Sequence, residues 1–158
     1  MEFRPFEEAD REAIHRITVA CFQPVSLHAL AEREYGRFRE VPWHQRKLAD
    51  IDADLAADPQ GVFVALETGE VVGFVTTRCD AATGIGRIYN LAVDPARQGR
   101  GLGAALLRCA LDHLRERGMG HAAIETIVGN VAGERLYPRL GFREYASQIH
   151  YLQPLDDD

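Results

Sequence analysis

Apolar and polar residues follow two different periods along this chain, and each period predicts a different kind of element. Short runs rich in valine, isoleucine and phenylalanine predict strands, whereas apolar residues that recur every three or four positions predict helices. The predicted strands are FRPF (3–6), GVFVAL (61–66), VVGFVTTRC (71–79), IYNLAV (88–93), AAIETI (122–127) and one or two strands within FREYASQIHYLQPL (142–155). The predicted helices are EADREAIHRITVACF (8–22), a region of about 26–58 interrupted near Pro42, LGAALLRCALDHLRER (102–117) and VAGERLYPRL (131–140).

The order of these elements predicts an α/β fold with one mixed sheet. The short stretch ETGE joins two apolar runs as a hairpin, so those strands are antiparallel. A helix separates the strands at 88–93 and 122–127, and such a crossover makes its two strands parallel. A chain of 158 residues forms one domain, 1–158, that buries roughly 70% of its unfolded surface.

Composition narrows the class of protein. The residues are 46% hydrophobic and 27% charged, close to the average for soluble globular proteins. A net charge of −6 disfavours binding to nucleic acid or to anionic membranes. The three cysteines have no metal-like spacing, and neither a signal peptide nor a long apolar run is present. We therefore expect a cytoplasmic protein with no metal and no membrane segment.

Three glycines occupy the segment DPARQGRGLGAALL (94–107), where a strand passes into a helix. Gly99, Gly101 and Gly103 let the backbone adopt unusual φ angles and approach a ligand closely. A helix N-terminus has unpaired N–H groups and a positive dipole, so it favours a phosphate. Arg97 and Arg100 flank the glycines and could add charged contacts. The segment is therefore predicted to bind an anion.

Two general templates for such a loop fit poorly. A P-loop has Lys followed by Ser or Thr after its last glycine, whereas Ala104 and Ala105 stand here. A dinucleotide fingerprint matches Gly99, Gly101 and Ala104, with Glu125 near the place of the ribose-binding acid. However, five residues (94–98) separate the strand from the first glycine, and only 33 residues follow Glu125.

A third template is a family resemblance. Val93-Asp94-Pro95 and Gln98-x-x-Gly101-x-Gly103-Ala104 resemble motif A of the GNAT superfamily of N-acetyltransferases. Asn130, Leu136-Tyr137 and Leu140-Gly141-Phe142 are similar to the family's N-x6-Y-x3-G-F signature, and both regions resemble ribosomal-protein alanine N-acetyltransferases. The resemblance implies a single-domain acyl-CoA N-acyltransferase (GNAT) fold. In that fold the sheet is mixed and mostly antiparallel, with a splayed parallel strand pair and helices on both faces.

The same resemblance implies acetyl-CoA as cosubstrate. The backbone of residues 98–104 would hold its pyrophosphate, and the pantetheine arm would lie between the splayed strands. Asn130 caps the following helix and could reach the cofactor from there. The cofactor-binding residues expected on this basis are Leu91, Ala92, Val93, Gln98, Gly99, Arg100, Gly101, Leu102, Gly103, Ala104 and Asn130.

Tyr137 occupies the family's general-acid position and is expected to hydrogen-bond the departing thiolate. Pro138 predicts that its helix ends or kinks at Tyr137. Glu125 is the first candidate for the base, although strand alternation could equally leave it on a solvated face. His150 ranks below it.

The acceptor stays open at this point: a peptide N-terminus, a lysine or a small amine all fit. A non-catalytic acyl-CoA sensor and, less favoured, a dinucleotide-binding protein are alternatives to an enzyme. A homodimer is possible, as in many relatives. Asp50, Asp54 and Asp58 share one helix face, which usually means a solvated stripe but could line the entrance for a cationic amine.

Overall fold

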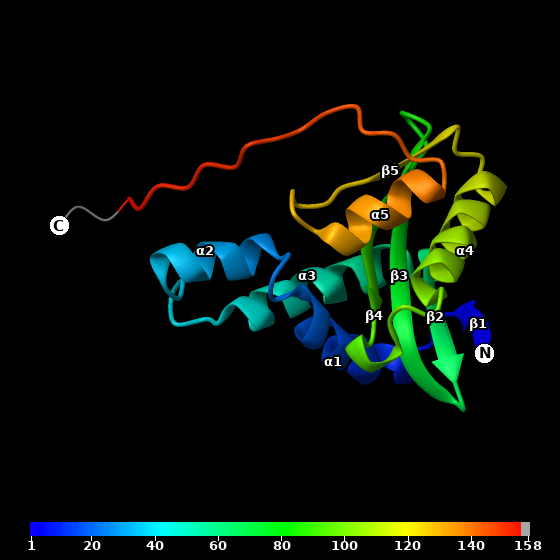
Figure 1. The fold of residues 1–158 in the computed structure, drawn as a ribbon, viewed down its shortest axis with the longest axis horizontal. Coiled ribbons are helices and arrows are strands. Elements are labelled where there is room, and N and C mark those ends of the chain that lie inside the picture. The colour runs from blue at the N-terminus through cyan, green and yellow to red at the C-terminus, as the bar shows by residue number, and fades with distance from the viewer. Residues whose placement is uncertain (156–158) are drawn as a thin grey trace.

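The computed structural model describes residues 1–155, which form a five-stranded sheet with helices on both faces (Figure 1). The strands lie in the order β1-β2-β3-β4-β5, and all neighbours are antiparallel except β4 and β5, which are parallel. Their bounds are β1 Glu2–Pro5, β2 Val62–Glu67, β3 Glu70–Asp80, β4 Ile85–Val93 and β5 His121–Ile124. The mixed sheet and its parallel pair confirm the fold expected from the sequence.

The helices divide between the two faces of the sheet. Their bounds are α1 Arg11–Phe22, α2 Leu27–Tyr35, α3 Trp43–Ala57, α4 Leu102–Glu116 and α5 Val131–Arg139. One core lies where α1 and α3 cover the sheet, centred on Ile14, Ile51 and Phe74. The other lies under α4 and α5, where Leu106 and Leu107 pack on Val75 and its neighbours. None of the helices in the described residues is long and apolar enough to cross a membrane.

Strand β4 carries the irregularity that shapes the site. Its register against β3 shifts, so that Asn90 pairs with Thr76 while Ile88 pairs with Thr77. Tyr89 is therefore the extra residue of a β-bulge, a feature that bends a strand and redirects its side chains. The pairing of β4 with β5 ends at Ile88 and Ile124. Residues 91–93 thus pair with β3 on one side only.

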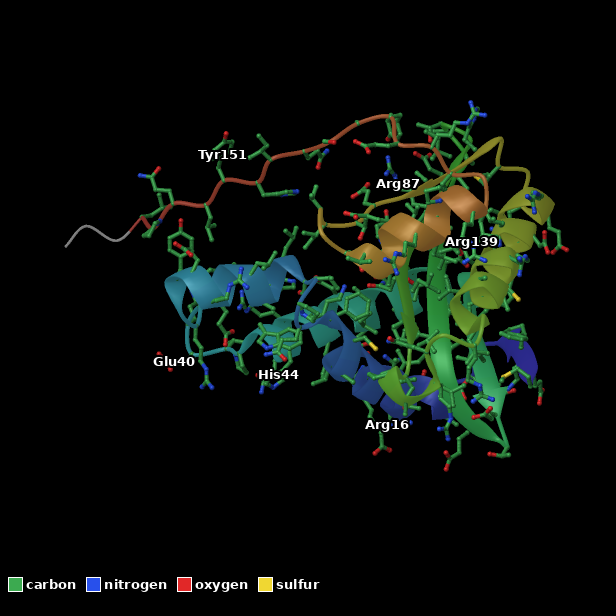
Figure 2. The ribbon with its side chains drawn as sticks, in the orientation of Figure 1. Arg16, Glu40, His44, Arg87, Arg139 and Tyr151 are labelled. Carbon is green, nitrogen blue, oxygen red and sulfur yellow. The ribbon has the colours of Figure 1, made fainter. Side chains whose placement is uncertain are left out.

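Two expectations for the end of the chain are wrong. The predicted strand at 122–127 ends at Ile124, so Glu125 follows the strand rather than lying within it. Residues 142–155 form no strand: the segment pairs with none of the five strands of the sheet, and the outer edge of β5 stays free. The segment instead runs past α2, where the Tyr35 hydroxyl donates to the Leu152 carbonyl at 2.9 Å, and Tyr151 points away from the sheet (Figure 2).

Candidate active site

The glycine segment forms an open loop that leads into α4. Gly99 and Gly101 have φ angles of +77° and +82°, in the left-handed region that favours glycine. A Cβ added at either position would meet no protein atom within 4 Å, so protein packing alone does not demand these glycines. Within the described residues, the backbone N–H groups of 98–104 have no hydrogen-bond partner. The loop therefore offers a row of free donors at a helix N-terminus, which is an anion-binding arrangement.

The side chains of this loop are directed to protein rather than to open space. Arg97 and Arg100 both pair with Glu67 at the end of β2, at 2.5 and 2.6 Å. The hydrogen bond from Arg100 is the main reason that the pKa of Glu67 is lowered. Gln98 Nε2 donates back to the carbonyl of Val93 at 2.9 Å. Any contact with a phosphate at Gln98 or Arg100 therefore falls to their main-chain groups in this conformation.

A slot opens where β4 and β5 separate. It has a volume of about 60 Å³ and is lined by Arg87, Ile88, Tyr89, Ala123, Ile124 and Glu125. Leu91, Ala92 and Val93 continue β4 beyond this point. Their edge away from β3 has no strand partner in residues 1–155, so its main-chain groups face the opening. This is the splayed pair that the sequence comparison implied.

Tyr137 lies on α5 and is half-buried against the core under α4. Its ring packs edge-on to Phe142, with 6.1 Å between centroids, and a Cβ at position 133 would lie only 2.9 Å from the ring, so Gly133 makes room for it. Burial raises the pKa of Tyr137, which keeps the hydroxyl protonated and able to donate. The hydroxyl has no hydrogen-bond partner in the described part of the chain.

The helix that carries Tyr137 extends further than expected. Pro138 lies inside α5, and the helix ends at Arg139 rather than at Tyr137. Asn130 is its N-cap, as expected: the side-chain oxygen accepts a hydrogen bond from the N–H of Gly133 at 3.5 Å. Its Nδ2 donates to the Thr126 hydroxyl at 2.8 Å.

Glu125 lies at the rim of the slot. Its side chain is 81% exposed, and Arg87 donates to its carboxylate at 3.0 Å. The carboxylate is thus well hydrated and held by one surface arginine. This environment fits both interpretations of Glu125, a base at the slot and a solvated residue at the end of the strand.

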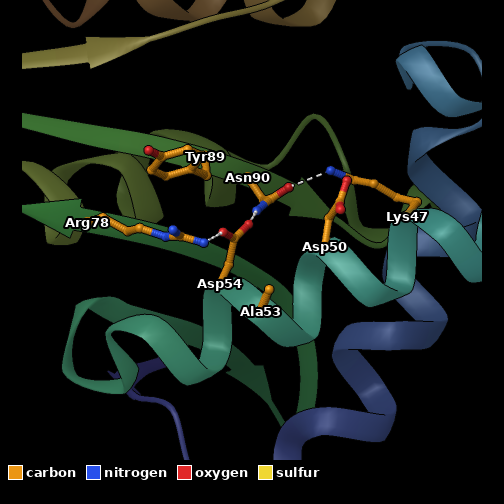
Figure 3. A pocket seen from close by; sticks show the side chains of 7 residues that line it. All are labelled: Lys47, Asp50, Ala53, Asp54, Arg78, Tyr89 and Asn90. Atoms are coloured by element: carbon orange, nitrogen blue, oxygen red, sulfur yellow. Dashed lines mark hydrogen bonds and ion pairs between the residues drawn. The ribbon is translucent and has the colours of Figure 1, made fainter.

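A larger pocket of about 310 Å³ lies beside the slot, between α3 and strands β3 and β4 (Figure 3). The residues that line it are Lys47, Asp50, Ala53, Asp54, Arg78, Tyr89 and Asn90. Tyr89 lines both the pocket and the slot, so the two openings adjoin at the β-bulge. Most of these residues were not singled out from the sequence.

The expected solvated stripe of aspartates is wrong for Asp54. Its side chain is buried, forms an ion pair with Arg78, and accepts a hydrogen bond from Asn90 Nδ2 at 2.6 Å. Asn90 is also buried and donates from Nδ2 to the Thr76 hydroxyl at 2.8 Å. Arg78 lies over the ring of Tyr89, 4.8 Å from its centroid. Partners from other strands therefore bury a carboxylate that its own helix would expose.

One group of side chains in residues 1–155 has the composition of a metal site. Asp58, Cys79 and His113 place one ligand atom each within 4.8 Å of one another, a cluster that sequence spacing did not suggest. None of the three lines the slot or the pocket.

Comparison with known proteins finds acetyltransferases that are similar in sequence. A mycothiol acetyltransferase from Streptomyces avermitilis is 40% identical over 107 residues, which cover 68% of this chain and 35% of that protein. The chain spans between 35% and 49% of the length of the curated relatives of this kind.

Solved structures share the fold. An acetyltransferase of the GNAT family from Brucella melitensis, in complex with acetyl-CoA, is 27% identical with a TM-score of 0.65, covering 91% of this chain and 83% of that one. The ribosomal-protein-S18-alanine N-acetyltransferase from Escherichia coli is 24% identical with a TM-score of 0.64, covering 92% and 79%. The sequence profile described as the acetyltransferase (GNAT) family matches residues 8–142, and the chain belongs to that family.

Proposed function

We propose that this chain transfers an acetyl group from acetyl-CoA directly to a primary amine. The observation that carries the proposal is the row of free N–H groups at 98–104, next to a slot that opens between β4 and β5. Backbone donors at a helix N-terminus suit a pyrophosphate. Family membership supports the choice of acetyl-CoA, which supplies the acetyl group as a thioester.

The residues expected at the reaction site have distinct roles in this reaction. The amine nitrogen bonds to the acetyl carbon while the carbon–sulfur bond breaks, and coenzyme A leaves as a thiolate that water then protonates, with water in turn taking up the proton that Glu125 receives. Tyr137 donates a hydrogen bond to the departing sulfur, a role that suits a phenol kept neutral by burial. Glu125 accepts the proton that the amine loses. The acetyl carbonyl would find main-chain N–H donors at residues 91–93.

Direct transfer is favoured over an acetylated enzyme. A cysteine nucleophile needs a lowered pKa, because the thiolate is the reactive form. Burial instead raises the pKa of Cys79 and Cys109, and raises that of Cys21 to about 11. Initial-rate kinetics test this point: intersecting lines support direct transfer, and parallel lines or an acetylated protein trapped without amine contradict it.

The acceptor is proposed to be a small-molecule amine. The mycothiol acetyltransferases among the curated relatives favour a small molecule over a peptide N-terminus or a protein lysine. Release of free thiol from acetyl-CoA against a broad amine panel tests the activity. Coenzyme A that binds and stabilises the protein, with no thiol released by any amine, would support an acyl-CoA sensor instead.

We also propose a homodimer, supported by the end of the chain. Residues 143–155 leave the domain in an extended form, and Tyr145, Ile149 and Tyr151 expose 87%, 78% and 89% of their surface. Among the described residues, β5 pairs on one side only, which leaves an edge that a second copy could cover. The mass in solution, measured by light scattering, decides between dimer and monomer.

A further inference from the structure

Lys47 is the only lysine in a chain with eighteen basic Lys and Arg residues. It lies on α3 and lines the 310 Å³ pocket that adjoins the slot at Tyr89. Lysine and arginine differ in chemistry: an ammonium is a compact point charge, whereas a guanidinium is a flat, two-pronged donor. Lys47, the one basic Lys or Arg residue that is not an arginine, thus faces the opening beside the proposed reaction site.

The ammonium group of Lys47 is held in place without a carboxylate partner. Its Nζ donates to Asn90 Oδ1 at 2.8 Å and lies 4.6 Å from the centroid of the Phe22 ring. No carboxylate oxygen of the described residues lies within 4.0 Å of it. Burial lowers the pKa of Lys47, whereas the charges of Asp50 and Asp54, both beyond ion-pair distance, raise it. Free donor capacity therefore remains on a half-buried cation.

The other basic side chains nearby already have partners. Arg78 pairs with Asp54, and His28 Nε2 lies 2.7 Å from Asp50 Oδ2. Arg46, the neighbour of Lys47 in sequence, pairs with Glu32 at 3.0 Å. Lys47 is thus the cation of this pocket that is left to bind an anion from outside.

Asn90 fixes the direction of the Lys47 ammonium. Its Nδ2 faces two acceptors, Asp54 and the Thr76 hydroxyl, so its Oδ1 must face Lys47. The four side chains Arg78, Asp54, Asn90 and Lys47 form one hydrogen-bonded row from β3 to α3 (Figure 3). Such a row holds a cation at a set place before any ligand arrives.

The pocket as a whole is ionic but balanced. Lys47 and Arg78 are opposed by Asp54 and by Asp50, whose side chain is 59% exposed at the rim. A pocket of this kind suits a molecule that carries both charges better than a polyamine or a polyanion. A single ammonium, with the guanidinium of Arg78 already paired with Asp54, matches a single carboxylate better than a phosphate.

We propose that the acceptor is an amine that also carries a carboxylate, an amino acid or a derivative of one, and that Lys47 binds this carboxylate. The acceptor amine then points past Tyr89 to the slot between β4 and β5. This inference rests on the proposed acetyl transfer and specifies the class of its acceptor.

Paired acceptors test the proposal on the unaltered protein. Free amino acids with different spacing between the amine and the carboxylate, namely glycine, β-alanine, γ-aminobutyrate and the common L-amino acids, are each compared with their carboxamides. We expect kcat/KM to be at least about tenfold higher for the acid of a productive pair, since a charged hydrogen bond is worth about 1.5–3 kcal/mol. Equal turnover of acid and amide, or turnover confined to amines without a carboxylate, overturns the inference while leaving acetyl transfer intact. No thiol release with any amine contradicts the proposed function itself.

Two charge-matched variants locate the effect. Lys47→Gln is expected to raise KM about tenfold or more for the acid and to leave its carboxamide within about twofold. Arg33→Gln removes an exposed cation on α2 that lines neither opening, and it should change neither value. An equal rise in KM for acid and amide in Lys47→Gln would overturn the role of Lys47. Unchanged affinity for acetyl-CoA and an unchanged circular dichroism spectrum show that the variant is folded.

Discussion

The two faces of the sheet carry two proposed binding surfaces of different kinds. Under α4 and α5, the proposed cofactor side consists of main-chain N–H groups, glycines with positive φ, and an apolar core that holds Tyr137. Under α3, the pocket is made of side chains that reach it from three separate elements, α3, β3 and β4. A surface of backbone donors tolerates many side-chain changes, whereas every substitution in the pocket changes what it can bind. The fold can therefore keep one cosubstrate while its acceptor changes.

The largest effect is expected on the cofactor side, from Tyr137→Phe. Loss of one donor to the departing sulfur should lower kcat by about a hundredfold to a thousandfold, with little change in the KM for acetyl-CoA. Steady-state kinetics measure both. Tyr145→Phe, at a tyrosine that is 87% exposed, is the matched control and should leave kcat unchanged. An unchanged kcat in Tyr137→Phe would reduce this residue to a packing role.

On the pocket side, the next effect should appear in stability. Asp54→Ala leaves Arg78 without its carboxylate and removes an acceptor from buried Asn90, so the free energy of unfolding should fall by about 2 kcal/mol. Asp112→Ala breaks the exposed pair with Arg115 and should cost less than about 0.5 kcal/mol. Urea denaturation gives both values. Equal losses of stability in the two variants would mean that the hydrogen-bonded row in the pocket stabilises the fold no more than an exposed ion pair does.

Glu125→Gln tests the residue at the rim of the slot, which lies between the proposed cofactor side and the pocket. We expect kcat/KM to fall about tenfold at neutral pH, less than the roughly hundredfold or more typical of a general base, because the carboxylate is largely exposed. The loss should shrink as pH rises through the pKa of the acceptor's own amine, since a neutral amine depends less on a base. A pH–rate profile of both proteins measures it. A deficit that stays constant with pH would assign Glu125 a different role.

A pair of glycine variants separates ligand contact from backbone strain. Gly101 and Gly84 both have positive φ, and an added Cβ would meet no protein atom within 4 Å at either site. Each alanine substitution should cost about 1 kcal/mol of stability. Only Gly101→Ala should also weaken coenzyme A binding, about fivefold by calorimetry, because its methyl group projects where the pyrophosphate is proposed to lie. Equal affinities in the two variants would place the ligand elsewhere.

The smallest effect concerns Cys21, which reaches from α1 to the carbonyl of Val93 at 3.2 Å. Burial raises its pKa to about 11, so little thiolate exists at pH 8. In a protein with Cys79 and Cys109 replaced by serine, alkylation by iodoacetamide should be slow at pH 8 and should quicken as pH approaches 11. The unfolded protein should react at the ordinary rate for a thiol. Rapid alkylation of the folded protein at pH 8 would show a reactive Cys21 thiolate and would support an acetylated cysteine as intermediate.

The loop and the split between β4 and β5, on the proposed cofactor side, could be predicted from the sequence because their signals are local. The loop at 98–104 joins a strand directly to a helix, and Tyr137 lies a fixed number of residues after Asn130. The pocket could not, because the burial of Asp54 depends on Arg78 and Asn90, which are 24 and 36 residues away. Lys47 could have been singled out from the sequence, because it is the one lysine among eighteen basic Lys and Arg residues. The alternation in residues 142–155 resembles a strand, yet a strand also needs a neighbour to pair with, and the local pattern carries no information on that.

The bulge at Tyr89 makes the length of β4 as important as its composition. Side chains normally alternate between the faces of a strand, and the extra residue lets two sequence neighbours, Tyr89 and Asn90, both line the pocket. Deleting Tyr89 would restore regular alternation and keep Asn90 opposite Thr76, but it would remove the residue that lines both openings. A deletion elsewhere in β4 would instead move every residue on one side of it to the opposite face, which would disturb the slot and the pocket together.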